Sequence, residues 1–211
     1  MLRITEIFLS IQGESTSVGL PTVFVRLTGC PLRCRYCDTA YAFSGGEQLS
    51  LDEILARVRA HGVERVTVTG GEPLAQPQCR TLLGNLCDAG FAVSLETSGA
   101  LSIEGIDRRV TTVMDLKTPS SGELERNRYA NVDLLRPHDE VKFVISDRAD
   151  YEWTKATMAE HTLTQRANVL LSPAHDELHP RELGEWMLAD HLPARLQVQL
   201  HKYLWGDEPG R

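Results

Sequence analysis

Short runs of β-branched and aliphatic residues alternate along the chain with stretches whose apolar residues recur at helical spacing. We expect strands at the apolar runs, residues 3–9, 23–27, 65–69, 91–96, 110–116, 141–145, 168–171 and 195–200. Several runs are dense in Val, Ile and Leu, which is typical of strands covered on both faces. Their order predicts repeated βα units and a mainly parallel sheet.

Helical patterns follow several of these strands. The first begins with the capping box Ser50-Leu51-Asp52-Glu53 and ends at His61-Gly62. Further helices are expected over residues 78–89, 147–161 and 180–189, and a loop over residues 120–122. The 211 residues are fewer than the ~250 of a closed eight-unit barrel, and crossover helices are few. We therefore predict an α/β fold, an open partial (βα) barrel in one domain over residues 1–211.

Composition and charge exclude several classes of protein. Hydrophobic residues make up 42% of the chain and charged residues 24%, which is ordinary for a globular protein. The net charge of −7 disfavours a nucleic-acid or anionic-membrane partner. No window reaches the roughly 18 apolar residues of a membrane span, and the first residues lack a signal-peptide core. We expect a soluble, cytoplasmic protein.

Polar residues follow the ends of several expected strands. In parallel sheets, the loops beyond the carboxyl ends of the strands build the active site. The segments are Thr69 to Glu72, Glu96 to Ser98, Asp115 to Lys117, Ser172 to His175, and His201. A strand end that meets water explains any one of them, but the whole set favours an active site.

Three of the five cysteines crowd together in Cys30-Pro31-Leu32-Arg33-Cys34-Arg35-Tyr36-Cys37. Crowding and an odd total favour a shared metal over disulfides. A 4Fe-4S cluster normally takes four thiolates, so three would leave one iron open to bind another molecule. Two alternatives stay open, a zinc site completed by a distant His or Cys, and three unrelated buried cysteines.

The remaining cysteines and a histidine pair have simpler explanations. Cys79 and Cys87 share a predicted helix face with leucines, which indicates buried core residues. His175 and His179 have the spacing of a helical metal pair, but neighbouring prolines make a continuous helix doubtful. We expect His179 at the surface.

The cysteine spacing, together with Gly70-Gly71-Glu72-Pro73, resembles the two signature motifs of radical S-adenosylmethionine enzymes. The resemblance implies a partial barrel of the radical SAM type and S-adenosylmethionine chelated at the open iron. Reductive cleavage then yields a 5'-deoxyadenosyl radical. Gly70 and Gly71 are expected to let the backbone approach the methionine end. Alone, the tetrapeptide would be a mere strand-to-helix connector.

Further segments narrow the resemblance to the 7-carboxy-7-deazaguanine synthases, from Gln12 to Leu204. They are Ile11 to Glu14, Arg26, Thr28 to Pro31, Tyr36 to Thr39, and His201 to Leu204. That family converts 6-carboxy-5,6,7,8-tetrahydropterin to 7-carboxy-7-deazaguanine with loss of ammonia, in queuosine biosynthesis. The resemblance implies a carbon–nitrogen lyase that uses a 4Fe-4S cluster, S-adenosylmethionine and Mg2+. It also implies an external one-electron donor and a homodimer.

The resemblance carries residue roles onto matching positions. The cluster ligands are Cys30, Cys34 and Cys37, which also carry the catalytic role, and the Mg2+ ligand is Thr39. The S-adenosylmethionine positions are Tyr36, Cys37, Asp38, Gly71, Glu72, Asp115, Leu116, Lys117, Ser172 and His175. The substrate positions are Ile11, Gln12, Gly13, Glu14, Arg26, Thr69, Glu96 and His201.

These roles suit the side chains, although each has an ordinary alternative. Arg26 can grip a carboxylate with two hydrogen bonds, or it is a surface arginine. Glu14 and Glu96 can accept the donor edge of a guanine-like ring, or they cap backbone amides. The hydroxyl of Thr39 suits a hard cation, or it belongs to a turn. Lys117 meets ligand oxygens or an exposed carboxylate partner.

Two rival functions share part of the pattern. A glycyl-radical enzyme activase has similar size and cysteine spacing, but leaves Arg26 and Thr39 without a purpose. A non-catalytic electron carrier or zinc-binding module is the rival of another class, although a carrier would need a fourth cysteine to seal its cluster. The tail from Trp205 to Arg211 either folds over the pocket or frays.

Overall fold

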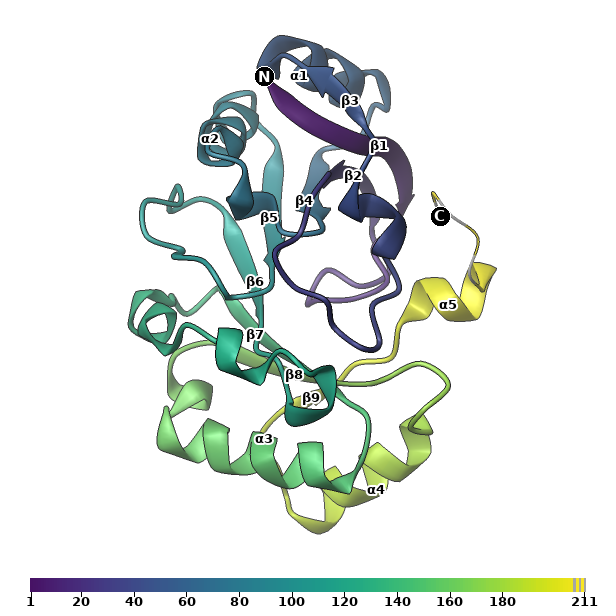
Figure 1. Cartoon of the computed structure of the whole chain (residues 1–211), viewed down its shortest axis with the longest axis vertical. Coiled ribbons are helices and arrows are strands. Elements are labelled where there is room, and N and C mark those ends of the chain that lie inside the picture. Colours follow the sequence, from purple (N-terminus) through teal and green to yellow (C-terminus); the bar gives the residue numbers. More distant parts are fainter. Residues whose placement is uncertain (207, 209, 211) are drawn as a thin grey trace.

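The computed structural model describes residues 1–206, 208 and 210. Within these residues one nine-stranded sheet has the order β3-β1-β2-β4-β5-β6-β7-β8-β9 (Figure 1). The strands are β1 (Leu2–Ile11), β2 (Pro21–Leu27), β3 (Glu47–Leu49), β4 (Arg65–Gly70), β5 (Ala92–Thr97), β6 (Thr111–Asp115), β7 (Glu140–Ile145), β8 (Asn168–Pro173) and β9 (Arg195–Leu196). The helices are α1 (Leu51–Ala60), α2 (Cys79–Asp88), α3 (Arg148–Glu160), α4 (Pro180–Ala189) and α5 (Leu200–Trp205). Short 3-10 helices are η1 (Ala40–Phe43), η2 (Pro73–Ala75), η3 (Pro119–Ser121), η4 (Leu124–Arg126), η5 (Tyr129–Leu134) and η6 (Leu163–Gln165).

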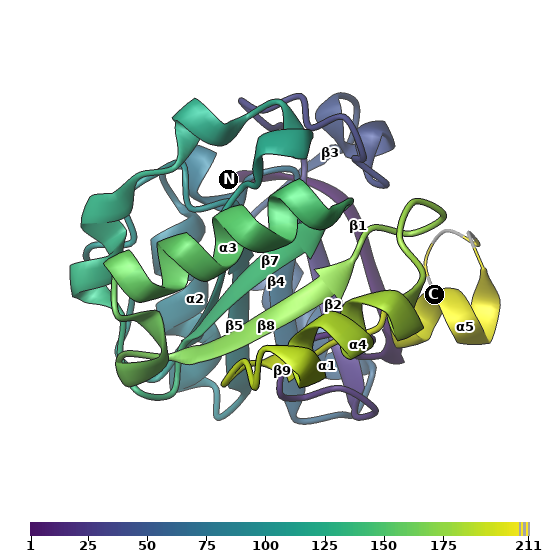
Figure 2. The same cartoon turned by 90° about the horizontal axis from the view of Figure 1, so that it is seen from below.

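The sheet is mainly parallel and open, as the sequence predicts. Each neighbouring pair from β2 to β9 is parallel, and β1 joins β2 and β3 in antiparallel pairs. The end strands β3 and β9 do not pair with each other, so the barrel is partial. Helices α1 to α4 lie outside the curved sheet, and α3 and α4 cover β7 and β8 in Figure 2.

The two faces of the central strands differ in polarity, which the sequence expectation of apolar strands did not include. On β4, Val66 and Val68 face the hydrophobic core, whereas the alternate residues Thr67 and Thr69 are buried and hydrogen-bonded on the other face. Because strand side chains alternate between faces, the helices cover an apolar surface and the concave side is polar. A polar interior with satisfied hydrogen bonds suits a binding cavity better than a core.

Two groups of buried apolar side chains pack between sheet and helices. One joins β1, β2, β4 and β5 to α1 and α2, and the other joins β6, β7 and β8 to α3 and α4. Cys79 and Cys87 belong to the first group, which confirms them as core residues. In the part of the chain that the structure describes, no helix combines the length and the apolar character that crossing a bilayer requires.

Local sequence signals located the helix ends well. The Ser50 hydroxyl accepts a hydrogen bond from the Glu53 amide at 3.2 Å, and the Glu53 carboxylate accepts one from the Ser50 amide at 2.7 Å. The capping box is therefore present. Gly62 and Gly90 follow α1 and α2 with positive φ angles of 69° and 89°. His179 is exposed and caps α4, so it lies at the surface as predicted.

The C-terminal region departs from the prediction. The strand expected over residues 195–200 ends at Leu196, and the chain then forms α5, so His201 lies on a helix. The reason is a long-range contact, because the Leu200 amide donates to the Gly13 carbonyl at 3.0 Å. The short strand β3 and the 3-10 turn η3 within the expected loop were also not predicted. Of the tail from Trp205, residues 207, 209 and 211 lie outside the described residues.

Candidate active site

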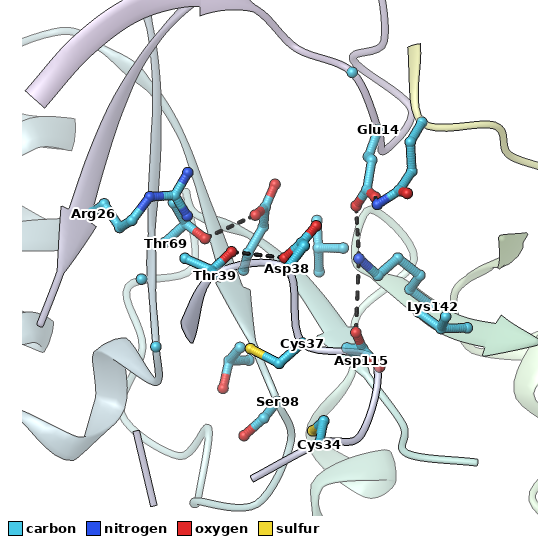
Figure 3. A pocket seen from close by; sticks show the side chains of 18 of the residues that line it. Glu14, Arg26, Cys34, Cys37, Asp38, Thr39, Thr69, Ser98, Asp115 and Lys142 are labelled. Carbon is cyan, nitrogen blue, oxygen red and sulfur yellow. Dashed lines mark hydrogen bonds and ion pairs between the residues drawn. The ribbon is translucent and has the colours of Figure 1, made fainter. Parts of the chain in front are cut away.

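A cavity of about 280 Å³ opens where the carboxyl ends of the parallel strands meet the loop of the three cysteines. Figure 3 shows side chains that reach it from β2, from the loops after β1 and β2, and from β4 to β7. The predicted site residues that line it are Ile11, Gln12, Gly13, Glu14, Arg26, Cys30, Cys34, Tyr36, Cys37, Asp38, Thr39, Thr69, Gly71, Glu96, Asp115, Lys117, His175 and His201. Residues as far apart in sequence as Ile11 and His201 therefore line one cavity, as expected if the loops beyond the carboxyl ends of parallel strands build the active site.

Three predicted cofactor residues do not line the cavity. Leu116 is fully buried in the second apolar group, and Ser172 is buried within β8. Leu116 faces the core because side chains alternate between the two faces, although its neighbours Asp115 and Lys117 reach the cavity. Ser172 pairs with Val144, which lines the cavity, so Ser172 lies on the concave face but is 1% exposed. Glu72 is also fully buried.

The Glu72 carboxylate binds the protein itself. It accepts hydrogen bonds from the Thr97 hydroxyl at 2.9 Å, from the Ser98 amide at 2.7 Å and from the Leu74 amide at 2.9 Å. These bonds join the loop after β4 to the loop after β5. These contacts give the Glu72 carboxylate a positioning role within the protein, and its contact with a methionine amino group stays a prediction.

The cysteine loop supplies a donor set that suits iron. Cys30, Cys34 and Cys37 are free thiols and all line the cavity. Burial raises the pKa of Cys30, and it raises the pKa of Cys34 to about 11. Within the described residues, no three His, Cys, Asp or Glu side chains converge as a metal site, so the sulfur atoms are close to the cavity without being gathered on one point. Gathering three thiolates requires loss of protons that metal binding drives.

The two glycines after β4 lie close to the end of β2 and to the start of the cysteine loop. A Cβ atom on Gly71 would lie 2.3 Å from the Gly29 carbonyl oxygen and 2.7 Å from Cys30 Cβ. A Cβ on Gly70, whose φ is +155°, would lie 2.2 Å from the Leu27 carbonyl oxygen. Both glycines therefore let the loop after β4 pack against the start of the cysteine loop. This contact within the chain gives both glycines a structural role, and the approach of their backbone to methionine stays a prediction.

Two carboxylates on the concave side have different charge environments. Burial alone would raise the pKa of Glu14, but Lys142, whose Nζ lies 2.6 Å from Glu14 Oε2, lowers it to about 2. Burial and the negative charge of Glu14 raise the pKa of Glu96. The Thr69 hydroxyl donates to Glu96 at 2.9 Å, and the Gln12 amide donates to it at 3.3 Å. The cavity thus holds one carboxylate that stays ionised and another that accepts a proton more readily.

Arg26 is held by neighbouring side chains of the protein. Its Nε lies 2.6 Å from Glu6 Oε1, which also accepts the Tyr41 hydroxyl at 2.8 Å. The guanidinium carbon lies 5.8 Å from the ring centre of Phe8 and 5.8 Å from that of Tyr41. Because Glu6 engages the Nε edge, the terminal nitrogens are left for an anion in the cavity. The alternative of a free surface arginine is excluded.

Asp115 and Lys117 form the other charged side of the cavity. Lys117 Nζ lies 3.1 Å from Asp115 Oδ2, and the lysine is 8% exposed. Although burial opposes a charged amine, Asp115 raises the pKa of Lys117. Asp115 Oδ1 is buried without a hydrogen-bond partner. A buried acceptor left unpaired at a cavity wall fits a ligand that brings a donor, such as a hydroxyl.

Two further predicted residues take their places through local contacts. The Thr39 hydroxyl lines the cavity and donates to Asp38 Oδ1 at 2.7 Å. His201 packs against Gly13 so closely that a Cβ on Gly13 would lie 2.1 Å from His201 Nδ1. Burial lowers the pKa of His201.

The sequence reasoning missed several lining residues, of which Lys142 and Gln199 carry polar groups. The signal for Lys142 was available, because a lysine in the middle of the apolar run Val141 to Ile145 must be paired if it is buried. Gln199 gave no signal, since it lies in a segment predicted as strand. The other missed residues that line the cavity are Phe8, Phe24, Leu32, Phe43, Val113 and Val144, whereas Gly70, Thr97, Ser98 and Ala174 lie within the polar strand-end segments that the sequence indicates.

Comparison with known proteins agrees with this geometry. Residues 24–160 match the family described as the Radical SAM superfamily. The chain is 47% identical over 210 residues to a protein named 7-carboxy-7-deazaguanine synthase from Chlorobaculum tepidum, covering 98% of this chain and 96% of that one. It is 43% identical over 223 residues to one of the same name from Koribacter versatilis, with 98% of each covered.

A solved structure described as QueE from Escherichia coli superposes with a TM-score of 0.73 at 25% identity, covering 95% of this chain and 94% of that one. Similarity over the full length, rather than over the cysteine loop alone, favours a synthase over a glycyl-radical activase, an electron carrier or a zinc module. The chain belongs to the radical SAM superfamily and, within it, to the 7-carboxy-7-deazaguanine synthase family.

Proposed function

We propose that this enzyme converts 6-carboxy-5,6,7,8-tetrahydropterin to 7-carboxy-7-deazaguanine with release of ammonia, as a step toward queuosine and related 7-deazapurines. The observation that carries the proposal is one cavity that joins three free thiols to Arg26, Glu14 and Glu96. In Figure 3, Arg26 and Glu14 lie on the side of the cavity away from Cys34. Substrate and product differ by one ammonia, so the overall reaction consumes no oxidant or reductant.

The cysteine loop and the charged pair after β6 fit the two cofactors of the superfamily. Cys30, Cys34 and Cys37 would hold a 4Fe-4S cluster, and the unpaired oxygen of Asp115, together with Lys117, would hold S-adenosylmethionine. When bound, these groups supply a carbon-centred radical that removes a hydrogen atom from the substrate. An external one-electron donor is part of the proposal.

The remaining residues bind and orient the pterin. The free edge of the Arg26 guanidinium would pair with the substrate carboxylate, while Glu14 would accept hydrogen bonds from its pyrimidine ring. Thr69 and Gln12 fix the orientation of Glu96 beside them. Burial of these groups excludes water and strengthens each polar contact.

A Glu6→Gln substitution tests the anchoring of Arg26. Loss of the carboxylate releases the Nε edge, so we expect KM for the pterin to rise about three- to tenfold, the size of one net hydrogen bond. Glu47→Gln is the matched control, because Glu47 pairs with Arg57 at the exposed surface. An equal KM for Glu6→Gln and Glu47→Gln would remove Glu6 from the account.

Mg2+ at Thr39 is the second part of the proposal. Mg2+ prefers oxygen ligands and keeps several waters or substrate oxygens, so one protein hydroxyl at the cavity suffices to place it. Thr39→Ala should weaken the dependence of the rate on Mg2+ concentration, whereas Thr39→Ser, which keeps the hydroxyl, should preserve it. An unchanged metal response in Thr39→Ala would take Thr39 out of the metal site.

The reaction itself is tested by mass spectrometry of products. Reduced, anaerobically reconstituted protein is incubated with S-adenosylmethionine, Mg2+ and the carboxytetrahydropterin. We expect a product lighter than the substrate by one ammonia, with S-adenosylmethionine regenerated. Cleavage of S-adenosylmethionine without this product would refute the substrate and leave the superfamily intact.

We also propose that the chain acts as one domain, forms a homodimer and works in the cytoplasm. The two apolar groups share one continuous sheet, which supports a single domain. A twofold dimer is the commonest assembly of small enzymes. A reducing compartment keeps three thiols available for iron.

A further inference from the structure

Lys142 lies in the middle of β7 with its side chain on the polar, concave side of the sheet. Its strand neighbours Val141 and Phe143 are fully buried in the core on the other face. The register of β6 and β7 pairs Lys142 with Asp115. The lysine side chain is 14% exposed, and its Nζ lies 2.6 Å from Glu14 Oε2 and 3.7 Å from Asp115 Oδ2 (Figure 3). One ammonium group therefore stands between the substrate side and the cofactor side of the cavity.

Charge explains why this lysine stays protonated and what it does to its neighbours. Burial opposes the charged amine, but Glu14, Asp115 and Glu96 raise the pKa of Lys142 well above its usual value. The ammonium in turn keeps Glu14 ionised, while Glu96 is shifted toward its protonated form. Buried carboxylates placed together cannot all carry charge without such a partner.

The hydrogen bonds of Glu14 leave a defined acceptor pattern. Its Oε2 accepts from Lys142, and its Oε1 accepts from the Gln199 amide at 2.9 Å. A carboxylate offers about four lone-pair sites, two on each oxygen. One site on each oxygen is therefore left over, which suits two N–H donors that lie side by side on a planar ring.

We propose that Lys142 is a positioning residue that holds Glu14 ionised and turned toward the cavity, so that Glu14 reads the amino group and adjacent ring N–H of the pterin. This inference rests on the proposed function, and it adds the residue through which the site comes to prefer the pterin ring. Without the ammonium, Glu14 would be a buried carboxylate beside Glu96, with a raised pKa. A protonated Glu14 loses an acceptor site and so loses its preference for a ring with two donors.

Several polar and charged groups surround Glu14 and influence its protonation. Lys142 approaches from β7, Gln199 and His201 from the segment at α5, and Glu96 from β5. Asp115 on β6 lies on the far side of Lys142. Variants at Lys142 leave the other four in place, so a comparison between such variants isolates the effect of the ammonium.

The test measures binding of 6-carboxypterin, the oxidised and unreactive form of the ring, to the reconstituted full chain under anaerobic conditions. Lys142→Met keeps the length and removes the charge, and we expect the affinity to fall about 30-fold or more. Lys142→Arg, which restores the charge, should recover most of the loss. The matched control is Lys155→Met, because Lys155 also pairs with two carboxylates, Glu152 at 2.9 Å and Asp190 at 2.6 Å, but away from the cavity. It should bind like the unaltered chain.

Two readouts separate positioning from simple loss of stability. 6-Carboxylumazine carries an exocyclic carbonyl oxygen in place of the amino group, so the unaltered chain should prefer the pterin and Lys142→Met should lose that preference. In Lys142→Met, pterin affinity should also fall as the pH is lowered from about 8 to about 6, because Glu14 then takes up a proton. Lys142→Arg should keep both the preference and the flatter pH profile.

The outcomes are distinct. Equal affinity, preference and pH profile in Lys142→Met and the unaltered chain would overturn the inference. If Lys142→Met does not fold, Lys142→Arg and Glu14→Gln carry the test, and a Glu14→Gln variant that still prefers the pterin would overturn it too. Binding of 6-carboxypterin together with no conversion of the carboxytetrahydropterin to product refutes the proposed function alone, whereas no binding by the unaltered chain refutes both.

Discussion

Replacing Cys34 by alanine is expected to abolish both the iron–sulfur cluster and the cleavage of S-adenosylmethionine. Cys34 is one of three thiols on the cavity, and two thiolates cannot anchor a cluster that already lacks a fourth protein ligand. Iron and sulfide analysis after anaerobic reconstitution measures the first loss, and formation of 5'-deoxyadenosine measures the second.

Cys87→Ala is the matched control for this loss. Cys87 is a free thiol too, but it is buried on α2 away from the cavity. It should retain iron, sulfide and cleavage activity at the level of the unaltered chain. Full iron content in Cys34→Ala, or equal loss in Cys87→Ala, would contradict the assignment of the cluster to the cysteine loop.

Gly71→Ala is expected to displace the start of the cysteine loop and prevent cluster assembly. The added Cβ meets the Gly29 carbonyl oxygen, which also accepts the Glu72 amide at 2.8 Å, so the obstacle is backbone that cannot turn aside. Overpacking of this kind costs about 1–3 kcal/mol of stability. Thermal unfolding and iron content measure the two effects.

Gly84→Ala makes the same chemical change where there is room. Gly84 lies in α2, and apart from the backbone of its own helix a Cβ there meets no atom of the described residues within 4 Å. Alanine suits a helix better than glycine, so the variant should gain about 0.5–1 kcal/mol and bind iron normally. A Gly71→Ala protein as stable and as rich in iron as Gly84→Ala would show that this close approach is unimportant.

Much of the site could be predicted because its motifs lie at strand ends. The fold class follows from the order of apolar runs, and parallel strands bring residues as distant as Arg26, Thr69 and Asp115 to one edge of the sheet. The cysteine spacing predicts a metal-binding loop, and the structure places all three cysteines on the cavity.

Other parts depend on contacts that no local pattern contains. α5 forms because Leu200 bonds to Gly13, and this contact brings Gln199 to Glu14 across 185 positions of sequence. The role of Lys142 depends on the fold, because its contacts with Asp115 and Glu14 form only when β7 lies beside β6 and opposite the loop of Glu14. Such pairings are properties of the folded chain, so a sequence reading that stops at motifs misses them.

Gly71 and Glu72 also make contacts within the protein that their sequence motif did not predict. Gly71 was predicted to make room for a ligand, and the structure adds that the nearest atoms a Cβ would meet belong to Gly29 and Cys30. Glu72 was predicted to bind the cofactor, and the structure adds that its carboxylate joins two loops inside the protein. Both residues therefore support the cysteine loop and the loop after β5 through contacts within the protein.

The central claim is a 4Fe-4S cluster held by three thiolates, with S-adenosylmethionine bound at the open iron. Electron–nuclear double resonance tests it most directly, on the reduced, reconstituted chain with S-adenosylmethionine whose carboxylate carries a magnetic oxygen isotope. The account predicts about four irons per chain and a hyperfine coupling between the cluster and the labelled oxygen. Bound zinc in place of iron, or a cluster without that coupling, would contradict it.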